Sequence, residues 1–74
     1  MKIEHLAANI RSHFGLSGLH IFDADGGWTV FGFRRHAEGF QALVESGSGE
    51  TIELALLDLN KRLDEGPIHK KSMA

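Results

Sequence analysis

The chain has 74 residues, a formal charge of −2, a hydrophobic fraction of 42% and no cysteine. A chain of this length builds one domain with a small core, and its composition is typical of a globular protein rather than a disordered one. The missing cysteines exclude a disulfide framework, a thiolate zinc site and a thiol nucleophile. No basic start leads into an apolar run of signal-peptide or membrane-spanning length, so we expect a cytoplasmic protein without membrane partners.

An amphipathic helix is predicted at the beginning of the chain. Apolar residues recur there at helical spacing and form one stripe: Ile3, Leu6, Ala7, Ile10 and Phe14. Gly15 follows, and glycine readily takes the left-handed conformation that ends helices. The predicted helix therefore spans residues 3–14.

Three strands are predicted next, over residues 19–24, 28–34 and 40–45. Asp25-Gly26-Gly27 is typical of a tight hairpin turn, and residues 35–39 are predicted as a second turn. In the third strand, apolar and polar positions alternate from Phe40 to Glu45. Residues 46–50 are small and polar, which predicts a loop.

A second helix is expected after Thr51, whose hydroxyl can act as its N-cap. Its apolar stripe is made of Ile52, Ala55, Leu56, Leu59 and Leu63, and Gly66 with Pro67 is expected to end it. Residues 66–74 are predicted to be a flexible tail. The expected fold class is a two-layer α+β domain over residues 1–65, with the order α-β-β-β-α and both helices on one face of an antiparallel sheet.

Apolar side chains exceed what this fold needs to bury. In the second strand, Trp28 lies on one face, while Phe31 and Phe33 lie on the other. Either the tail covers the face away from the helices or that face is an interface, because large exposed apolar patches usually mark binding sites. Leu54 and Leu57 lie off the stripe of the second helix, which indicates either a deeply buried helix or a stripe for self-association or a partner.

No pattern in the sequence indicates a catalytic, cofactor or metal site. The histidines at 5, 13, 20, 36 and 69 form no i, i+4 pair, and no serine lies in a nucleophile elbow. Asp23 and Asp25 are interpreted as turn residues. Gly47-Ser48-Gly49 resembles half of a phosphate-binding loop, but Glu50 and Glu53 would repel a phosphate there. We therefore expect no enzyme activity, no cofactor and no metal.

One basic cluster precedes an acidic stretch. Arg34, Arg35 and His36 stand together, whereas residues 37–60 contain five carboxylates and no lysine or arginine. The cluster is either a solvated turn or a contact for phosphates or an acidic partner. The separation of charge suits a protein partner better than a nucleic-acid groove.

The order and length of the elements resemble those of a double-stranded RNA-binding domain. In that family, the second helix opens with lysines that contact phosphates. The matching residues here are Gly49-Glu50-Thr51-Ile52-Glu53, which would repel phosphates. The resemblance therefore implies the fold and argues against the activity.

A second resemblance covers residues 43–63. The run Gly49-Glu50-Thr51-Ile52-Glu53-Leu54-Ala55-Leu56 looks like the strand-to-helix ending of HicB-like antitoxins, which carry a Gly-x-Thr-x-Glu-Glu-Ala pattern. Leu54 stands where that family has a second glutamate. The general type, one small unit with mixed charge and no active-site motif, is similar to small phage proteins, including anti-CRISPR inhibitors.

These observations favour a non-enzymatic protein-binding module, encoded by a phage or mobile element, that inhibits or modulates a larger host complex. The expected partner-binding residues are aromatic, basic or leucine side chains: Trp28, Phe31, Phe33, Arg34, Arg35, His36, Leu54 and Leu57. A nucleic-acid-binding regulator with a double-stranded RNA-binding-like fold is the alternative, and a homodimer is a further one.

Overall fold

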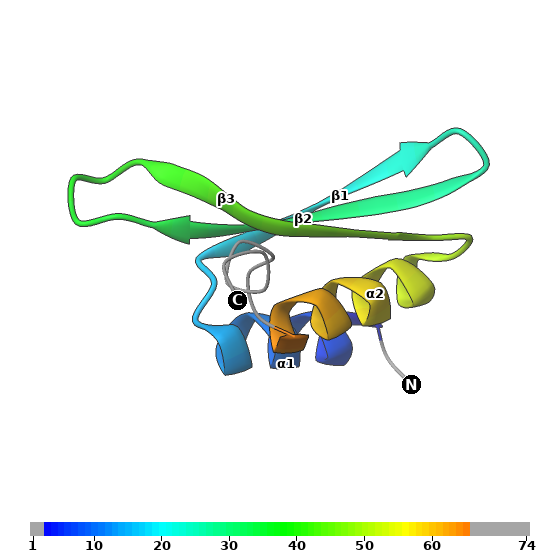
Figure 1. Cartoon of the computed structure of the whole chain (residues 1–74), viewed down its shortest axis with the longest axis horizontal. Helices are drawn as coiled ribbons and strands as arrows, with labels where there is room; N and C mark the ends of the chain where they lie inside the picture. Colours follow the sequence, from blue (N-terminus) through cyan, green and yellow to red (C-terminus); the bar gives the residue numbers. More distant parts are fainter. Residues whose placement is uncertain (1–2, 66–74) are drawn as a thin grey trace, which may run out of the picture.

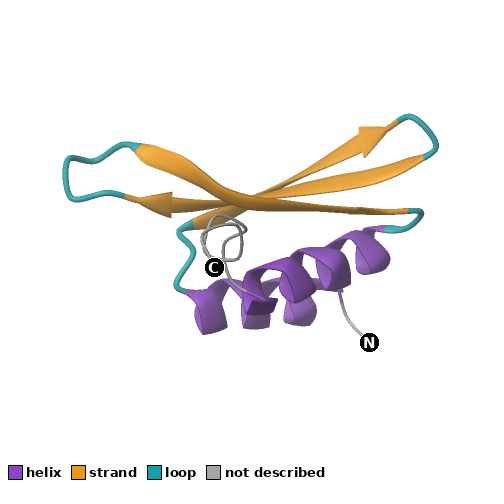
Figure 2. Cartoon of the chain, in the orientation of Figure 1, coloured by secondary structure: helices purple, strands orange, loops and turns teal. Residues whose placement is uncertain are grey.

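The computed structural model describes residues 3–65 as two helices packed on one face of a three-stranded sheet (Figures 1 and 2). The elements follow the predicted order: α1 (Ile3–Phe14), β1 (Gly18–Ala24), β2 (Gly27–Arg35), β3 (Gln41–Gly49) and α2 (Ile52–Glu65). The strands are antiparallel, in the order β1-β2-β3. The predicted α+β class is confirmed, whereas Gly66, Pro67 and the predicted tail lie outside the described residues. Neither described helix is long and apolar enough to cross a membrane.

The ends of the elements are set largely by local chemistry. Gly15 has a φ of 65° and follows the last turn of α1, as the sequence predicts. Gly26 has a φ of 72° in the turn between β1 and β2, a conformation that glycine adopts without a steric penalty. At the start of α2, the backbone N–H of Leu54 donates to the Thr51 hydroxyl at 3.1 Å, which confirms the predicted N-cap.

The core lies between the two helices and the sheet. α1 contributes Ile10, β2 contributes Val30, and α2 contributes its inner face, so that the following residues are buried: Ile10, Leu16, Val30, Ala55, Leu56 and Leu59. Partly buried apolar side chains from every element surround this cluster. The predicted stripe of α2 is buried or partly buried throughout, whereas that of α1 is buried or partly buried except at Ile3, which is 39% exposed. The sheet covers the core with one face only.

The third strand differs from its prediction. β3 begins at Gln41 rather than Phe40 and continues through Gly49, so the loop predicted for residues 46–50 is wrong except at Glu50. Opposite Gly32, the register shifts by one residue, which places Val44 and Glu45 together against a single residue of β2. This β-bulge interrupts the predicted alternation. Beyond it, Gly47 and Gly49 rather than the serines face the helices.

Helix α2 requires the glycines at the end of β3. A Cβ atom at Gly47 would lie 2.6 Å from the carbonyl oxygen of Ala55, and one at Gly49 would lie 2.7 Å from the Cβ of Leu54. Real Cβ atoms do not come this close to other heavy atoms. The Gly47-Ser48-Gly49 segment is therefore part of a strand that packs closely against α2, rather than a flexible turn.

Candidate binding surface on the open sheet face

Side chains on β2 alternate between the helix layer and the open face. Val30 is fully buried, so Trp28 and Gly32 also point toward the helices, whereas Phe31 and Phe33 point away from them. The pairing register carries this assignment to both neighbouring strands. The open face, which we define by these residues, comprises Gly18, His20, Phe22 and Ala24 of β1, Gly27, Thr29, Phe31, Phe33 and Arg35 of β2, and Gln41, Leu43, Ser46 and Ser48 of β3.

Four aromatic rings gather at the centre of this face, and we call His20, Phe22, Phe31 and Phe33 the aromatic cluster. The ring centroids of His20 and Phe33 lie 4.7 Å apart. Those of Phe22 and Phe31 lie 5.2 Å apart, and Phe31 and Phe33 make an edge-to-face contact at 6.4 Å. These separations fall in the range in which aromatic pairs attract one another. The cluster is therefore a preorganised surface.

The cluster is open to solvent. Phe22 is 44% exposed and Leu43, which stands opposite Phe33, is 56% exposed. No element of the described chain covers this side of the sheet (Figure 1). We therefore consider the aromatic cluster with Leu43 to be a candidate binding surface.

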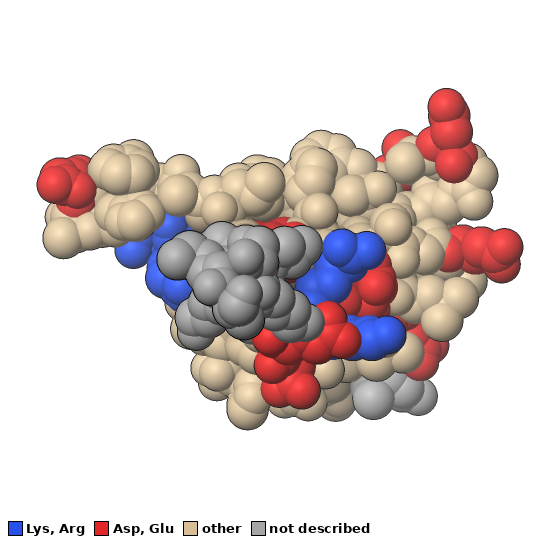
Figure 3. Space-filling model, in the orientation of Figure 1, with Lys and Arg blue, Asp and Glu red and all other residues tan. Residues whose placement is uncertain are grey.

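The open face carries little charge. Arg35 is the single charged residue of this face, and the face contains no carboxylate. In Figure 3, the top of the sheet between the two hairpin tips is without lysine, arginine, aspartate or glutamate, while charged side chains lie around the helices and at the tips. A low density of charge at the centre is typical of the buried part of a protein interface.

The structure separates the residues that the sequence predicts as partner contacts. Phe31, Phe33 and Arg35 share the open face. Trp28 lies on the helix side, packed against the core. Leu54 and Leu57 are 49% and 44% exposed on α2, which is in the other layer.

The basic cluster is divided in the same way. Arg34 donates from Nη2 to the carbonyl oxygen of Phe14 at 2.7 Å and from Nε to that of Gly15 at 3.3 Å. It therefore occupies the carbonyl end of α1, where a cation is favourable. His36 lies in the following turn, where its ring stacks on Phe40 with a centroid separation of 4.6 Å. Of the basic cluster, only Arg35 belongs to the open face.

Sequence reasoning omitted three members of the candidate surface. His20 and Phe22 lie on the face of β1 opposite Leu19, and Leu43 precedes the β-bulge on β3. Alternation along β1 and along the first half of β3 places these residues on one face of each strand. Joining that face to Phe31 and Phe33 requires the pairing register, which the sequence alone does not supply.

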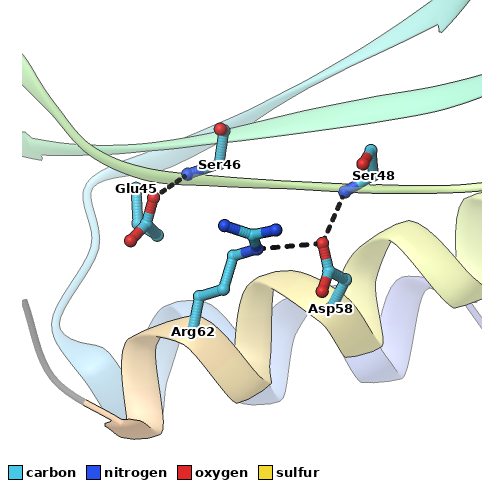
Figure 4. A network of polar contacts seen from close by, with 5 residues as sticks. All are labelled: Glu45, Ser46, Ser48, Asp58 and Arg62. Carbon is cyan, nitrogen blue, oxygen red and sulfur yellow. Dashed lines mark hydrogen bonds and ion pairs between the residues drawn. The ribbon is translucent and has the colours of Figure 1, made fainter. Parts of the chain in front are cut away.

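The outer edge of β3 is closed by carboxylates (Figure 4). The Ser46 N–H donates to Oε1 of Glu45 at 3.0 Å, and the Ser48 N–H donates to Oδ2 of Asp58 at 2.9 Å. The same oxygen of Asp58 accepts a bond from Nε of Arg62 at 3.1 Å. The Ser48 N–H, followed by Arg62, lowers the pKa of Asp58 below its ordinary value of 3.8 despite an opposing effect of burial.

Within residues 3–65, no group of three histidine, aspartate or glutamate side chains is placed to hold a metal ion. A search of protein-family models, of curated proteins and of solved structures found no match to this chain.

Proposed function

We propose that the chain is a non-enzymatic protein-binding module that docks its partner on the open face of the sheet. The observation that carries this proposal is the aromatic cluster, which lies with Leu43 on a face that no described element covers. Exposed contiguous apolar surface on a small domain usually marks a binding site. Aromatic rings are also among the side chains on which binding energy concentrates.

The chemistry of the face specifies the kind of partner. An apolar patch on the partner would cover Phe22 and Leu43, the most exposed apolar members of the face. A carboxylate on the partner would pair with Arg35 at the end of β2. Hydroxyls of Ser46 and Ser48 would supply hydrogen bonds at the rim, as polar groups do in most interfaces.

The test compares two double variants as bait for proteins of the native host. Phe22→Ser with Leu43→Ser removes exposed apolar area from the open face, while Leu54→Ser with Leu57→Ser removes it from α2. We expect the α2 variant to retain the wild-type partner, identified by quantitative mass spectrometry, and the open-face variant to lose it. Circular dichroism of both variants controls for folding. Loss of the partner only by the α2 variant, or no specific partner for the wild type, would contradict the proposal.

The finer hypothesis concerns the identity of the partner. A phage- or mobile-element-encoded inhibitor or modulator would capture a subunit of a larger host complex in the same experiment. This hypothesis rests on features shared with small phage proteins, namely one small unit, mixed charge and no active-site motif. The identity of the captured protein tests it.

The order α-β-β-β-α that the chain shares with double-stranded RNA-binding domains does not favour a second function. Glu50 and Glu53 stand at the start of α2, where the resemblance places lysines. Phosphates would be repelled there rather than attracted. We expect no retention of duplex RNA in a gel shift at low salt, where electrostatic binding is strongest.

A further inference from the structure

The two edges of the sheet differ in how their backbone groups are used. The order β1-β2-β3 makes β1 and β3 the edge strands. On β3, the outward N–H groups of Ser46 and Ser48 are bonded to the carboxylates of Glu45 and Asp58 (Figure 4). Natural sheets block their edges with such side chains to prevent unwanted strand pairing. The second half of β3, at Ser46 and Ser48, is therefore a protected edge.

The hydrogen-bond pattern fixes which groups of β2 face β1. The Ser17 N–H donates to the carbonyl oxygen of Phe33 at 2.8 Å, so the backbone groups of Phe33 point toward β1. Because backbone groups alternate in direction along a strand, those of Phe31 and Thr29 also point toward β1. The outward N–H of Ser48, which stands opposite Thr29, agrees with this alternation.

The same alternation identifies the free groups of β1. His20 and Phe22 stand opposite these two residues of β2 and bond to them. The N–H and C=O groups of Leu19, Ile21 and Asp23 consequently point away from the sheet. Within the described residues, no hydrogen bond reaches these outward groups. In contrast to the second half of β3, β1 is an open edge.

This open edge is complementary to itself. If two β1 strands pair antiparallel around a twofold axis at Ile21, each Ile21 stands opposite its counterpart and each Leu19 stands opposite an Asp23. All of these residues have outward donors and acceptors, so every such pair can exchange both backbone hydrogen bonds. A surface that matches itself about a twofold axis is what a symmetric dimer requires.

The side chains of β1 fit the same register. Ile21 is 39% exposed on the helix side and would contact Ile21 of the second copy, while Phe22 is 44% exposed on the open face and would stand opposite His20. Aromatic pairs in this cross-strand position are stabilising. The two Asp23 carboxylates lie at opposite ends of the pairing, so like charges do not face each other. β1 also lacks the lysine or proline that commonly blocks an edge.

We propose that the protein forms a homodimer by antiparallel pairing of its β1 strands, centred on Ile21, which joins the two sheets and makes the two aromatic clusters one surface. This proposal does not rest on the proposed function, because it involves the β1 edge and a second copy of the chain rather than a foreign partner. The two proposals are also tested separately, since dimerisation is measured on the purified chain alone.

The absence of cysteine from the sequence makes disulfide trapping a direct test. Hydrogen-bonded antiparallel pairs have Cα atoms about 5.5 Å apart, a distance that a disulfide spans. We expect Ile21→Cys to form a covalent dimer as its main product on mild oxidation. Ser48→Cys, on the protected β3 edge, is the matched control and should remain monomeric. An equal or slower reaction of Ile21→Cys than of Ser48→Cys would overturn the proposal.

A mixture of two variants tests the register. In the proposed pairing, His20 stands opposite Phe22, so a mixture of His20→Cys and Phe22→Cys should yield mainly the mixed disulfide, identified by its mass. Each variant alone places its cysteines out of register and should yield little dimer. A preference for either symmetric disulfide over the mixed one would refute the register.

Proline tests the dependence on backbone groups. Ile21→Pro removes an N–H that points outward, so the pairing of β1 with β2 is retained. We expect sedimentation equilibrium to give twice 8.1 kDa for the wild type and 8.1 kDa for Ile21→Pro. Ile21→Ala keeps the N–H and should remain dimeric, and circular dichroism verifies that both variants fold. A wild-type mass of 8.1 kDa at every concentration would disprove the dimer.

Discussion

Gly47 of β3 packs directly against Ala55 of α2. The two backbones are so close that a Cβ atom on the glycine would stand 2.6 Å from the alanine carbonyl oxygen. Ala55 is itself fully buried, as are Leu56 and Leu59. The small size of Gly47 and Ala55 thus allows the backbone of α2 to contact the backbone of β3. This close approach positions α2 on one face of the sheet and leaves the opposite face open.

Adding one methyl group at this contact should destabilise the domain. Extra methylene groups in a packed core typically cost about 1–3 kcal/mol. At Gly47 the obstacle is the helix backbone, so we expect Gly47→Ala to lower the free energy of unfolding by about 3 kcal/mol. Gly18→Ala is the matched control, because an added Cβ there meets nothing within 4 Å. Urea unfolding measures both, and equal stability of the two variants would contradict the account.

This contact also explains where sequence reasoning failed in the fold. Glycine is depleted in strands, and residues 46–50 are small and polar, so the sequence predicts a loop there. Local preference gives no signal that a helix requires glycines at these positions. The β-bulge at Val44 and Glu45 also has no local signal in the sequence, because it depends on how β3 pairs with Gly32. By contrast, the Gly15 stop and the Thr51 cap are local and were predicted.

The candidate surface was predictable only in part. Alternation separates Trp28 from Phe31, but both faces of β2 carry aromatic rings, so the sequence did not show which face the helices cover. The burial of Val30 decides this. Arg34 and Arg35 are adjacent and chemically identical, yet only the fold shows that Arg34 contacts α1. A function without a local sequence motif is therefore the hardest to predict from the sequence.

The two adjacent arginines should differ in their effect on stability. Arg34 donates to two carbonyl oxygens at the end of α1, whereas Arg35 is exposed on the open face. Hydrogen bonds from charged donors at a helix end contribute about 1 kcal/mol when exposed. We expect Arg34→Ala to lower the free energy of unfolding by that amount and Arg35→Ala to leave it nearly unchanged. Thermal unfolding of the matched pair checks this, and equal losses would contradict it.

Asp58 should make the stability of the domain depend on pH. Its pKa lies below the ordinary value of 3.8, chiefly because the Ser48 N–H donates to it. A carboxyl group with a lowered folded-state pKa stabilises the protein fully above its unfolded pKa and loses this effect as pH falls through the folded value. We expect Asp58→Asn to reduce the free energy of unfolding by about 1 kcal/mol at neutral pH.

The difference between wild type and Asp58→Asn should shrink as the pH falls below 3.8 and vanish once the folded-state carboxyl is protonated. Urea unfolding of both proteins across this range measures it. The comparison cancels the titration of the other carboxylates, which the two proteins share. A difference that stays constant down to the lowest pH would mean that the charge on Asp58 does not stabilise the edge.

Two neighbouring leucines of α2 separate core packing from surface recognition. Leu56 is fully buried, whereas Leu57 is 44% exposed. Truncating a buried leucine costs about 2–5 kcal/mol, so Leu56→Ala should lose much of the stability of so small a domain. Leu57→Ala should cost well under half as much, and its cost should be independent of protein concentration. A cost at Leu57 that grows with concentration would instead place this side of α2 in a self-association interface, because a subunit contact stabilises the folded state by mass action.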